Sequence, residues 1–364
     1  MVPIEQRFTP KGWSVRRSIL MELDIAISIL TGGIMTGEKE EFALLVQSVK
    51  ADQLQELQDL IGPTHSCFRP ILEPLAWLAG VLFEEDYAAA THEVGQLSFQ
   101  SAYDTLTGKK GSTLVQKEVL ADKFLDLLME VNRENSIELM PDSIRRNHND
   151  LIVSLSFLRG EPKALDFWRW LDRFYYENYQ PWKVTRQPLM DMNHQMALGY
   201  LGATEGMDVP PLDWLSEKNP LRRVPGLRSA VESGMRHVVF WVEPFCMTDT
   251  WTAYPGLVAV SFAPPGAIFD GFADYARQLS NGLQALSDPT RLIILRLIRN
   301  MAMNNTDMAE YLNLARPTVS IHARILREAG LIHTYADGRA ARHEIDTQAI
   351  RKLFADLDRF LDLP

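Results

Sequence analysis

Residues 306–345 read as a short helix, a tight turn, a longer helix and a β-hairpin, in that order. The longer helix spans about 316–329 and stops at Gly330, which can adopt the left-handed conformation of a helix cap. After it, two short extended runs flank Asp337-Gly338, a dipeptide typical of tight hairpin turns. A helix-turn-helix followed by a hairpin is the order of a winged helix-turn-helix, and it restricts the fold of the C-terminal part to that class.

Further helices are predicted on both sides of this unit. Apolar residues recur at helical spacing over 271–286, and Asp288 with Pro289 suits the N-cap and first position of a second helix through Ile298. A closing helix is indicated by one apolar stripe, formed by Ile350, Leu353, Phe354, Leu357, Phe360 and Leu361.

The helix at 316–329 has two chemically different faces. Val319, Ala323 and Leu326 are spaced i, i+4 and i+7, so they should face the core. The other face carries cations, hydroxyls and a histidine. A charged helix face is more often ordinary solvated surface, but the element order favours a helix that reads base edges in the major groove. Arginines of the hairpin would reach the DNA backbone or the adjacent minor groove. The expected DNA-binding residues are Arg316, Thr318, Ser320, Ile321, His322, Arg324, Arg327, Arg339 and Arg342.

This part of the chain resembles the ArsR-type winged-helix transcriptional repressors. The matching blocks are residues 285–291, 308–314, 317–320 with His322, 326–331, and the wing dipeptide Gly338-Arg339. On pattern alone, the closing helix could cover its own domain or lie in a dimer interface. The resemblance implies a homodimer, paired through the first and last helices of the domain, on a palindromic operator in double-stranded DNA. It also implies that an inducer usually releases the DNA. The implied dimerisation residues are Leu279, Leu283, Ile350, Leu353, Phe354, Leu357 and Leu361.

The sequence departs from the family pattern at three places. Ala315 stands where Ser or Thr often caps the recognition helix, so a cap worth about 1 kcal/mol is missing. Ile321 replaces a residue that is usually polar. The segments 306–312 and 346–351, where metal-sensing members carry ligands, contain neither Cys nor His. We therefore expect no metal and no cofactor.

Charge divides the chain into two parts. The formal net charge is −10, and residues from Phe272 onward have 12 Lys+Arg and 11 Asp+Glu, a net of +1, which leaves −11 for the rest. An acidic first part is not expected to touch DNA. The two cysteines, Cys67 and Cys246, form no disulfide framework, and no signal or membrane-spanning pattern occurs. We expect a cytoplasmic protein.

The predicted fold class is mainly α. A large helical domain, residues 1–265, contains a small strand pair at 237–242 and 257–263, and the winged helix-turn-helix occupies 266–364. A cluster of aromatic residues in the first domain is expected to lie in its core, and the alternative is an apolar ligand pocket or a surface for a partner helix. The cluster comprises Phe167, Trp168, Trp170, Phe174, Tyr175, Tyr176, Tyr179 and Trp182.

The sequence favours a homodimeric repressor that is not an enzyme. Its N-terminal domain would sense a non-metal signal, a small apolar effector or a protein partner, or serve assembly. No nucleophile motif, phosphate-binding loop or dinucleotide fingerprint supports catalysis. The alternative is an N-terminal enzyme or protein-interaction module, with the winged helix as a docking or autoregulatory element.

Overall fold

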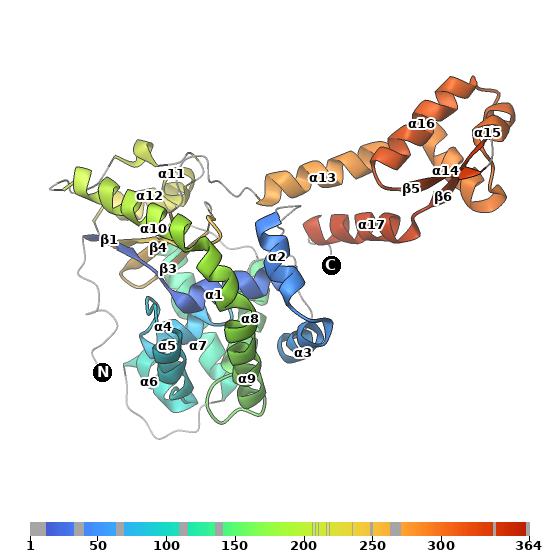
Figure 1. Ribbon diagram of the computed structural model, residues 1–364. Helices are drawn as coiled ribbons and strands as arrows, with labels where there is room; N and C mark the ends of the chain where they lie inside the picture. The colour runs from blue at the N-terminus through green and yellow to red at the C-terminus, as the bar shows by residue number, and fades with distance from the viewer. Residues whose placement is uncertain are drawn as a thin grey trace. The chain divides into compact units, whose positions relative to one another are not determined.

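The computed structural model describes residues 12–32, 40–62, 69–108, 116–134, 141–205, 207, 209, 211–215, 217, 219–234, 236–247, 250–262, 271–337 and 340–361. These residues form two compact units, one within 12–262 and one comprising 271–361 (Figure 1). The expected boundary between residues 265 and 266 lies outside the described residues and stays a prediction.

Helices dominate both units, which confirms the predicted mainly α fold class. The helices of the N-terminal unit are α1 (Ile19–Leu30), α2 (Glu40–Ser48), α3 (Ala51–Ile61), α4 (Glu73–Ala79), α5 (Tyr87–Gly95), α6 (Phe99–Thr107), α7 (Lys117–Glu134), α8 (Pro141–Leu155), α9 (Ala164–Phe174), the π-helical turn η2 (Tyr175–Tyr179), α10 (Gln180–Ala203), the 3-10 turn η3 (Leu212–Trp214), α11 (Pro220–Arg223) and α12 (Pro225–Glu232).

The N-terminal unit also contains a four-stranded sheet in the order β1-β2-β4-β3. Its strands are β1 (Gly12–Arg16), β2 (His237–Trp241), β3 (Trp251–Tyr254) and β4 (Leu257–Ser261). The two predicted strands do pair, as β2 and β4, and they run parallel. The two further strands were not predicted: β1 joins the free edge of β2 in parallel, and β3 forms an antiparallel hairpin with β4.

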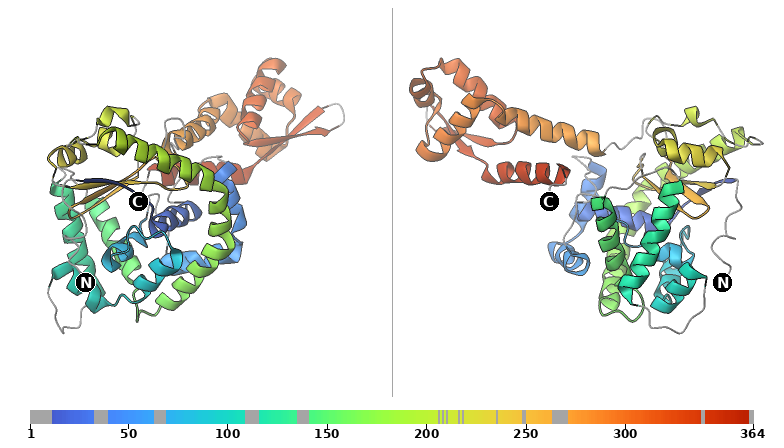
Figure 2. Two further views of the ribbon diagram at one scale, coloured as in Figure 1. Left: turned by 60° about the vertical axis from the view of Figure 1, so that its left-hand side comes forward. Right: turned by 180° about the vertical axis from the view of Figure 1, so that it is seen from behind.

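Both faces of this sheet are covered by helices (Figure 2). Successive side chains of a strand point to opposite faces. Val239 and Trp241 of β2 accordingly join the larger core with residues of α1, α4 and α9. Val238 and Phe240 join a second core, to which α10 and α12 contribute. Burial on both faces explains why β2 and β4 are continuous apolar runs.

The aromatic side chains around α9 fill the larger core. Phe167, Trp170, Phe174 and Tyr179 are fully buried, and the rings of Trp170 and Phe174 stack with centroids 5.1 Å apart. Tyr176, by contrast, is exposed. Trp182 is also buried in this core, so the core interpretation is confirmed for these five rings.

The C-terminal unit has the element order expected of a winged helix-turn-helix. Its elements are α13 (Gly271–Leu286), α14 (Pro289–Met301), α15 (Asn305–Leu312), α16 (Arg316–Glu328), the antiparallel wing strands β5 (Ile332–Asp337) and β6 (Ala340–Ile345), and α17 (Thr347–Leu361). Helices α14, α15 and α16 enclose a small core that includes Ile294, Met308, Val319 and Leu326. Helix α17 packs against α13 (Figure 1).

Candidate nucleic-acid interface

The turn between α15 and α16 is built by residues with special backbone roles. The Asn304 side chain caps α15 by accepting from the backbone N–H groups of Thr306 and Asp307, so the helix begins one residue before the predicted Thr306. Asn313 ends the helix with φ at 52°, a left-handed conformation that Asn tolerates. These two caps fix where α16 leaves the turn.

The inward face of α16 is confirmed. Val319, Ala323 and Leu326 are buried in the core of the C-terminal unit. The helix ends beside Gly330, whose φ of 71° is the left-handed cap expected from the sequence. At its other end Ala315 is the N-cap and makes no side-chain hydrogen bond. The first turn of α16 therefore keeps backbone N–H groups free of side-chain caps.

The opposite face of α16 is open to solvent. Arg316, Ser320, Arg324 and Arg327 are exposed, and Ile321 is 49% exposed although it is a large apolar residue. Thr318 is half-buried. Arg324 lies 3.8 Å from Glu328 one turn along the helix, an exposed pair that holds it only weakly. This face therefore presents cations, a hydroxyl and an apolar contact to solvent together.

His322 differs from its neighbours on α16. Its side chain is only 16% exposed, and its Nδ1 lies 3.8 Å from the Asp288 carboxylate. Asp288 caps α14 by accepting from the backbone N–H of Arg291, a bond that lowers the pKa of its carboxyl. The ring thus sits between the recognition helix and the start of α14. Helical spacing could not show this contact, because Asp288 belongs to another helix.

The wing contributes one described cation. Arg342 on β6 is exposed, while Arg339 lies outside the described residues. The next residue, His343, points to the other face of the strand and is 5% exposed. Its ring lies 2.8 Å from the side chain of Asn305 and 3.0 Å from Thr334 Oγ1. The sequence interpretation missed His343 and Asn305, although strand alternation alone would place His343 inward.

The apolar faces of α13 and α17 are partly covered by each other. A Cβ atom on Gly282 would lie 2.7 Å from the Leu353 Cδ1 atom, so the glycine permits close approach of the two helices. Along their length runs an open groove of about 530 Å³, which includes Leu279, Leu283, Leu357 and Leu361 in its lining. Among the residues expected at a dimer interface, Leu279 is buried, Leu283, Ile350, Leu353 and Leu357 are half-buried, and Phe354 and Leu361 are each 54% exposed.

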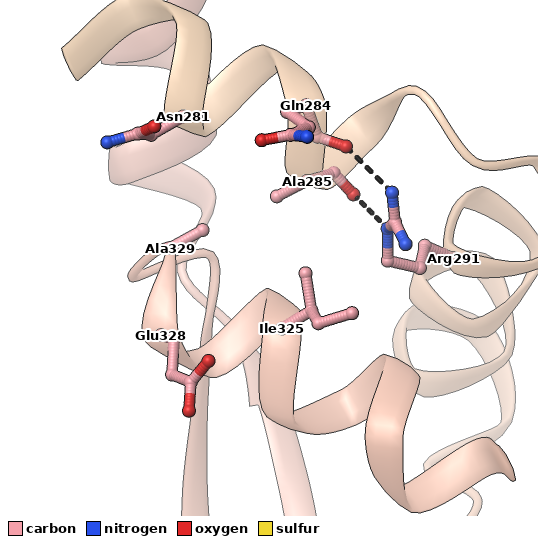
Figure 3. Close-up of a pocket in the computed structure, with 7 residues that line it drawn as sticks. All are labelled: Asn281, Gln284, Ala285, Arg291, Ile325, Glu328 and Ala329. Carbon is pink, nitrogen blue, oxygen red and sulfur yellow. Dashed lines mark hydrogen bonds between the residues drawn. The ribbon is translucent and has the colours of Figure 1, made fainter. Parts of the chain in front are cut away.

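A second hollow of about 420 Å³ lies where α13, α14 and α16 meet (Figure 3). Arg291 forms one wall, and its guanidinium donates to the backbone carbonyls of Ala285 and Gln284, each at 2.7 Å. Ile325 and Glu328 approach from α16. The hollow is open to solvent, and the Arg291 guanidinium in its wall already donates hydrogen bonds to the end of α13.

The described residues contain no group of three or more His, Cys, Asp or Glu side chains that could hold a metal ion. Within the same ranges, none of the helices combines the length and the apolar character that crossing a lipid bilayer requires.

Comparison with known proteins finds similarity in the C-terminal part. Residues 288–334 match the family described as bacterial regulatory protein, arsR family. The chain is 33% identical over 73 residues to the transcriptional repressor SdpR of Bacillus subtilis (strain 168), covering 20% of this chain and 81% of that protein. It is 37% identical over 90 residues to the HTH-type transcriptional regulator NmtR of Mycobacterium tuberculosis (strain ATCC 25618 / H37Rv), covering 24% and 73%. It is 29% identical over 82 residues to the arsenical resistance operon repressor of Staphylococcus xylosus, covering 22% and 79%.

Proposed function

We propose, because this chain belongs to the ArsR family of bacterial regulatory proteins, that its C-terminal unit binds a specific sequence in double-stranded DNA and represses transcription. The family membership makes the chain a DNA-binding transcriptional regulator. The observation that supports sequence-specific binding is the solvent-exposed face of α16. Its cations and the Ser320 hydroxyl are exposed to solvent, while three buried apolar residues hold the helix to its unit.

Each exposed group suits a different part of a DNA site. Arg324 can donate two hydrogen bonds to guanine, and Ile321 can contact a thymine methyl group. Arg316 and Arg327 flank these residues and suit phosphate groups, as does Arg342 on the wing. The uncapped N–H groups at the start of α16 are also oriented as a phosphate site requires. Within this proposal His322 orients α16 through its contact with Asp288, and only the exposed edge of the His322 ring is available to contact DNA.

We further propose that the protein is a homodimer on a palindromic operator. The apolar groove between α13 and α17, together with exposed Phe354 and Leu361, is the surface that a second copy would cover. An isologous contact of this kind places two recognition helices in a two-fold arrangement. Two-fold symmetry in the protein then requires two-fold symmetry in the operator.

The N-terminal unit is proposed as the part that receives the signal. Its residues carry the excess of acidic charge, which disfavours contact with DNA. We propose a non-metal effector or a protein partner as its ligand, so that binding there changes the affinity of the C-terminal unit for the operator.

The proposal is tested by DNA binding of the full chain. An operator is first selected from random duplexes, and the affinity of Arg324→Ala for it is then measured. We expect a loss of about 1–3 kcal/mol with relaxed preference at one base pair, because the guanidinium would no longer read a base edge. Arg169→Ala removes an exposed cation from the N-terminal unit and serves as the matched control. Equal affinities of the wild type and Arg324→Ala would refute the base-reading role.

A further inference from the structure

The buried imidazole of His343 links the wing to the helix-turn-helix. It lies on β6, which packs against α15, and it is 5% exposed. Both ring nitrogens have partners: Nε2 lies 2.8 Å from Asn305 Oδ1, and Nδ1 lies 3.0 Å from Thr334 Oγ1. Burial, together with the nearby Arg327 cation, lowers the pKa of His343. The ring is therefore neutral at pH 7, with one donor nitrogen and one acceptor nitrogen.

The partners fix which nitrogen donates. Asn305 Oδ1 can only accept, so Nε2 of His343 carries the proton. Nδ1 then accepts from the hydroxyl of Thr334. The other side of the Asn305 amide, Nδ2, donates to Ser320 Oγ on α16 at 3.3 Å. A continuous hydrogen-bond relay thus runs from Thr334 on β5 through His343 on β6 and Asn305 on α15 to Ser320 on the exposed face of the recognition helix.

The relay determines what Ser320 can offer. A serine hydroxyl has one donor and two acceptor positions, and it rotates freely when nothing holds it. Asn305 occupies one acceptor position of Ser320 from the side of α15. The hydroxyl proton must then point elsewhere, and Ser320 is exposed on the outward face. A rotor restrained in this way loses less entropy when it donates to a ligand.

We propose that Asn305 and His343 are positioning residues that hold the Ser320 hydroxyl as a hydrogen-bond donor toward an acceptor atom of DNA. The acceptor is a phosphate oxygen or the N7 or oxygen of a base, since all of these accept in the same way. The inference rests on the proposed DNA binding and assigns the wing strand a role in recognition that needs no direct contact of its own with DNA.

The test is a double-mutant cycle in the full chain on the selected operator. Ser320→Ala and Asn305→Ala should each weaken binding about 3- to 10-fold, the range of one hydrogen bond. If Asn305 acts through Ser320, the double variant binds no more weakly than Ser320→Ala, within a factor of about 2. Thr306→Ala, an exposed neighbour on α15, is the matched control and should bind like the wild type.

A merely structural role of Asn305 gives a different result. Its loss would then multiply with that of Ser320→Ala, and multiplied losses would overturn the proposal. A second cycle, His343→Gln with Ser320→Ala, asks the same question of the wing, and multiplied losses there would remove His343 from the relay. Circular dichroism of each variant checks folding. Failure of the wild type to select any duplex would instead refute the proposed function.

Modified operators identify the acceptor. Methylphosphonate at the contacted phosphate should abolish the difference between wild type and Ser320→Ala if that phosphate is the acceptor. A 7-deazapurine at the contacted base should do so if the acceptor is N7. A difference that persists on every phosphate- and base-modified duplex would exclude donation by Ser320 and overturn the inference.

Discussion

Arg291 joins two helices of the C-terminal unit through a single guanidinium. It donates to the carbonyls of Gln284 and Ala285, near the end of α13, where the helix leaves carbonyl groups without intrahelical partners. Its side chain is only 11% exposed, and both bonds are charge-assisted. The residue therefore ties the proposed dimerisation helix to the helix-turn-helix.

Removing this guanidinium should destabilise the C-terminal unit. For Arg291→Ala we expect the free energy of unfolding to fall by about 2 kcal/mol, because the two carbonyls lose a charged donor. Denaturant unfolding measures the change. Arg299→Ala, an exposed arginine of the same helix, should change stability by less than about 0.5 kcal/mol. Equal effects of the two substitutions would show that the Arg291 bonds do not contribute.

Helix α16 begins without a side-chain cap. Ala315 has extended backbone angles, φ −64° and ψ 136°, which suit an N-cap residue, yet alanine cannot accept a hydrogen bond. Ala315→Ser should raise the free energy of unfolding of the C-terminal unit by about 1 kcal/mol, because the hydroxyl can accept from the N–H of Thr318. Ala315→Val, which has no acceptor, is the control and should give no gain. Thermal unfolding of both variants decides the matter, and an equal gain from valine would contradict the capping explanation.

Elements set by local chemistry were predictable, and those set by distant contacts were not. The bounds of α13, the cap at Asp288 and the left-handed Gly330 follow from short stretches of sequence. Residues 40–61, by contrast, are divided into α2 and α3 at residues 49–50, a break that no proline or glycine marks. Pro181 does not break the helical run from α9 to α10: it follows the π-helical turn η2 and lies in the first turn of α10. A wider turn leaves room for the ring of proline, which has no backbone N–H to donate.

The residues of the candidate site divide in the same way, into those placed by local sequence and those placed by contacts with distant segments. Val319, Ala323 and Leu326 face inward because the period of the helix alone determines their side. The surroundings of His322 and His343 depend on Asp288 and Asn305, which lie 34 and 38 positions away along the chain. Strand β1 was missed because its partner β2 lies far away along the chain. Strand β3 forms a hairpin with the neighbouring β4 and was missed because its four residues are too few to show a strand pattern.

At the scale of the whole molecule, the N-terminal unit buries carboxyl groups whose pKa is raised, whereas the C-terminal unit buries a histidine whose pKa is lowered. In the N-terminal unit, burial raises the pKa of Glu243 to about 8, although its carboxylate accepts from the N–H groups of Phe245 and Met247. Burial also raises the pKa of Glu22, Asp24 and Glu73 in that unit. Among the described groups of the C-terminal unit with a resolved shift, namely Asp288, His343 and Asp346, each pKa is lowered.

These shifts predict opposite responses of the two units to pH. A carboxyl whose pKa is raised by folding binds its proton more tightly in the native state, so stability falls as pH rises towards the native pKa. Between pH 6.5 and 8 the N-terminal unit should therefore lose stability while the C-terminal unit changes little. Below pH 6.5 the unfolded chain protonates its histidine before the native state does, so buried His343 should make the C-terminal unit less stable as pH falls.

Calorimetric scans of the full chain from pH 5 to 8 measure both responses. Leu326→Ala, which opens a cavity only in the C-terminal unit, identifies the transition of that unit by lowering its temperature. Glu243→Gln is the decisive variant, because the amide cannot ionise. It should reduce the loss of N-terminal stability between pH 6.5 and 8 and leave the acid response of the C-terminal unit as it is. If its slope in that interval matches the wild type, Glu243 does not titrate as its burial requires.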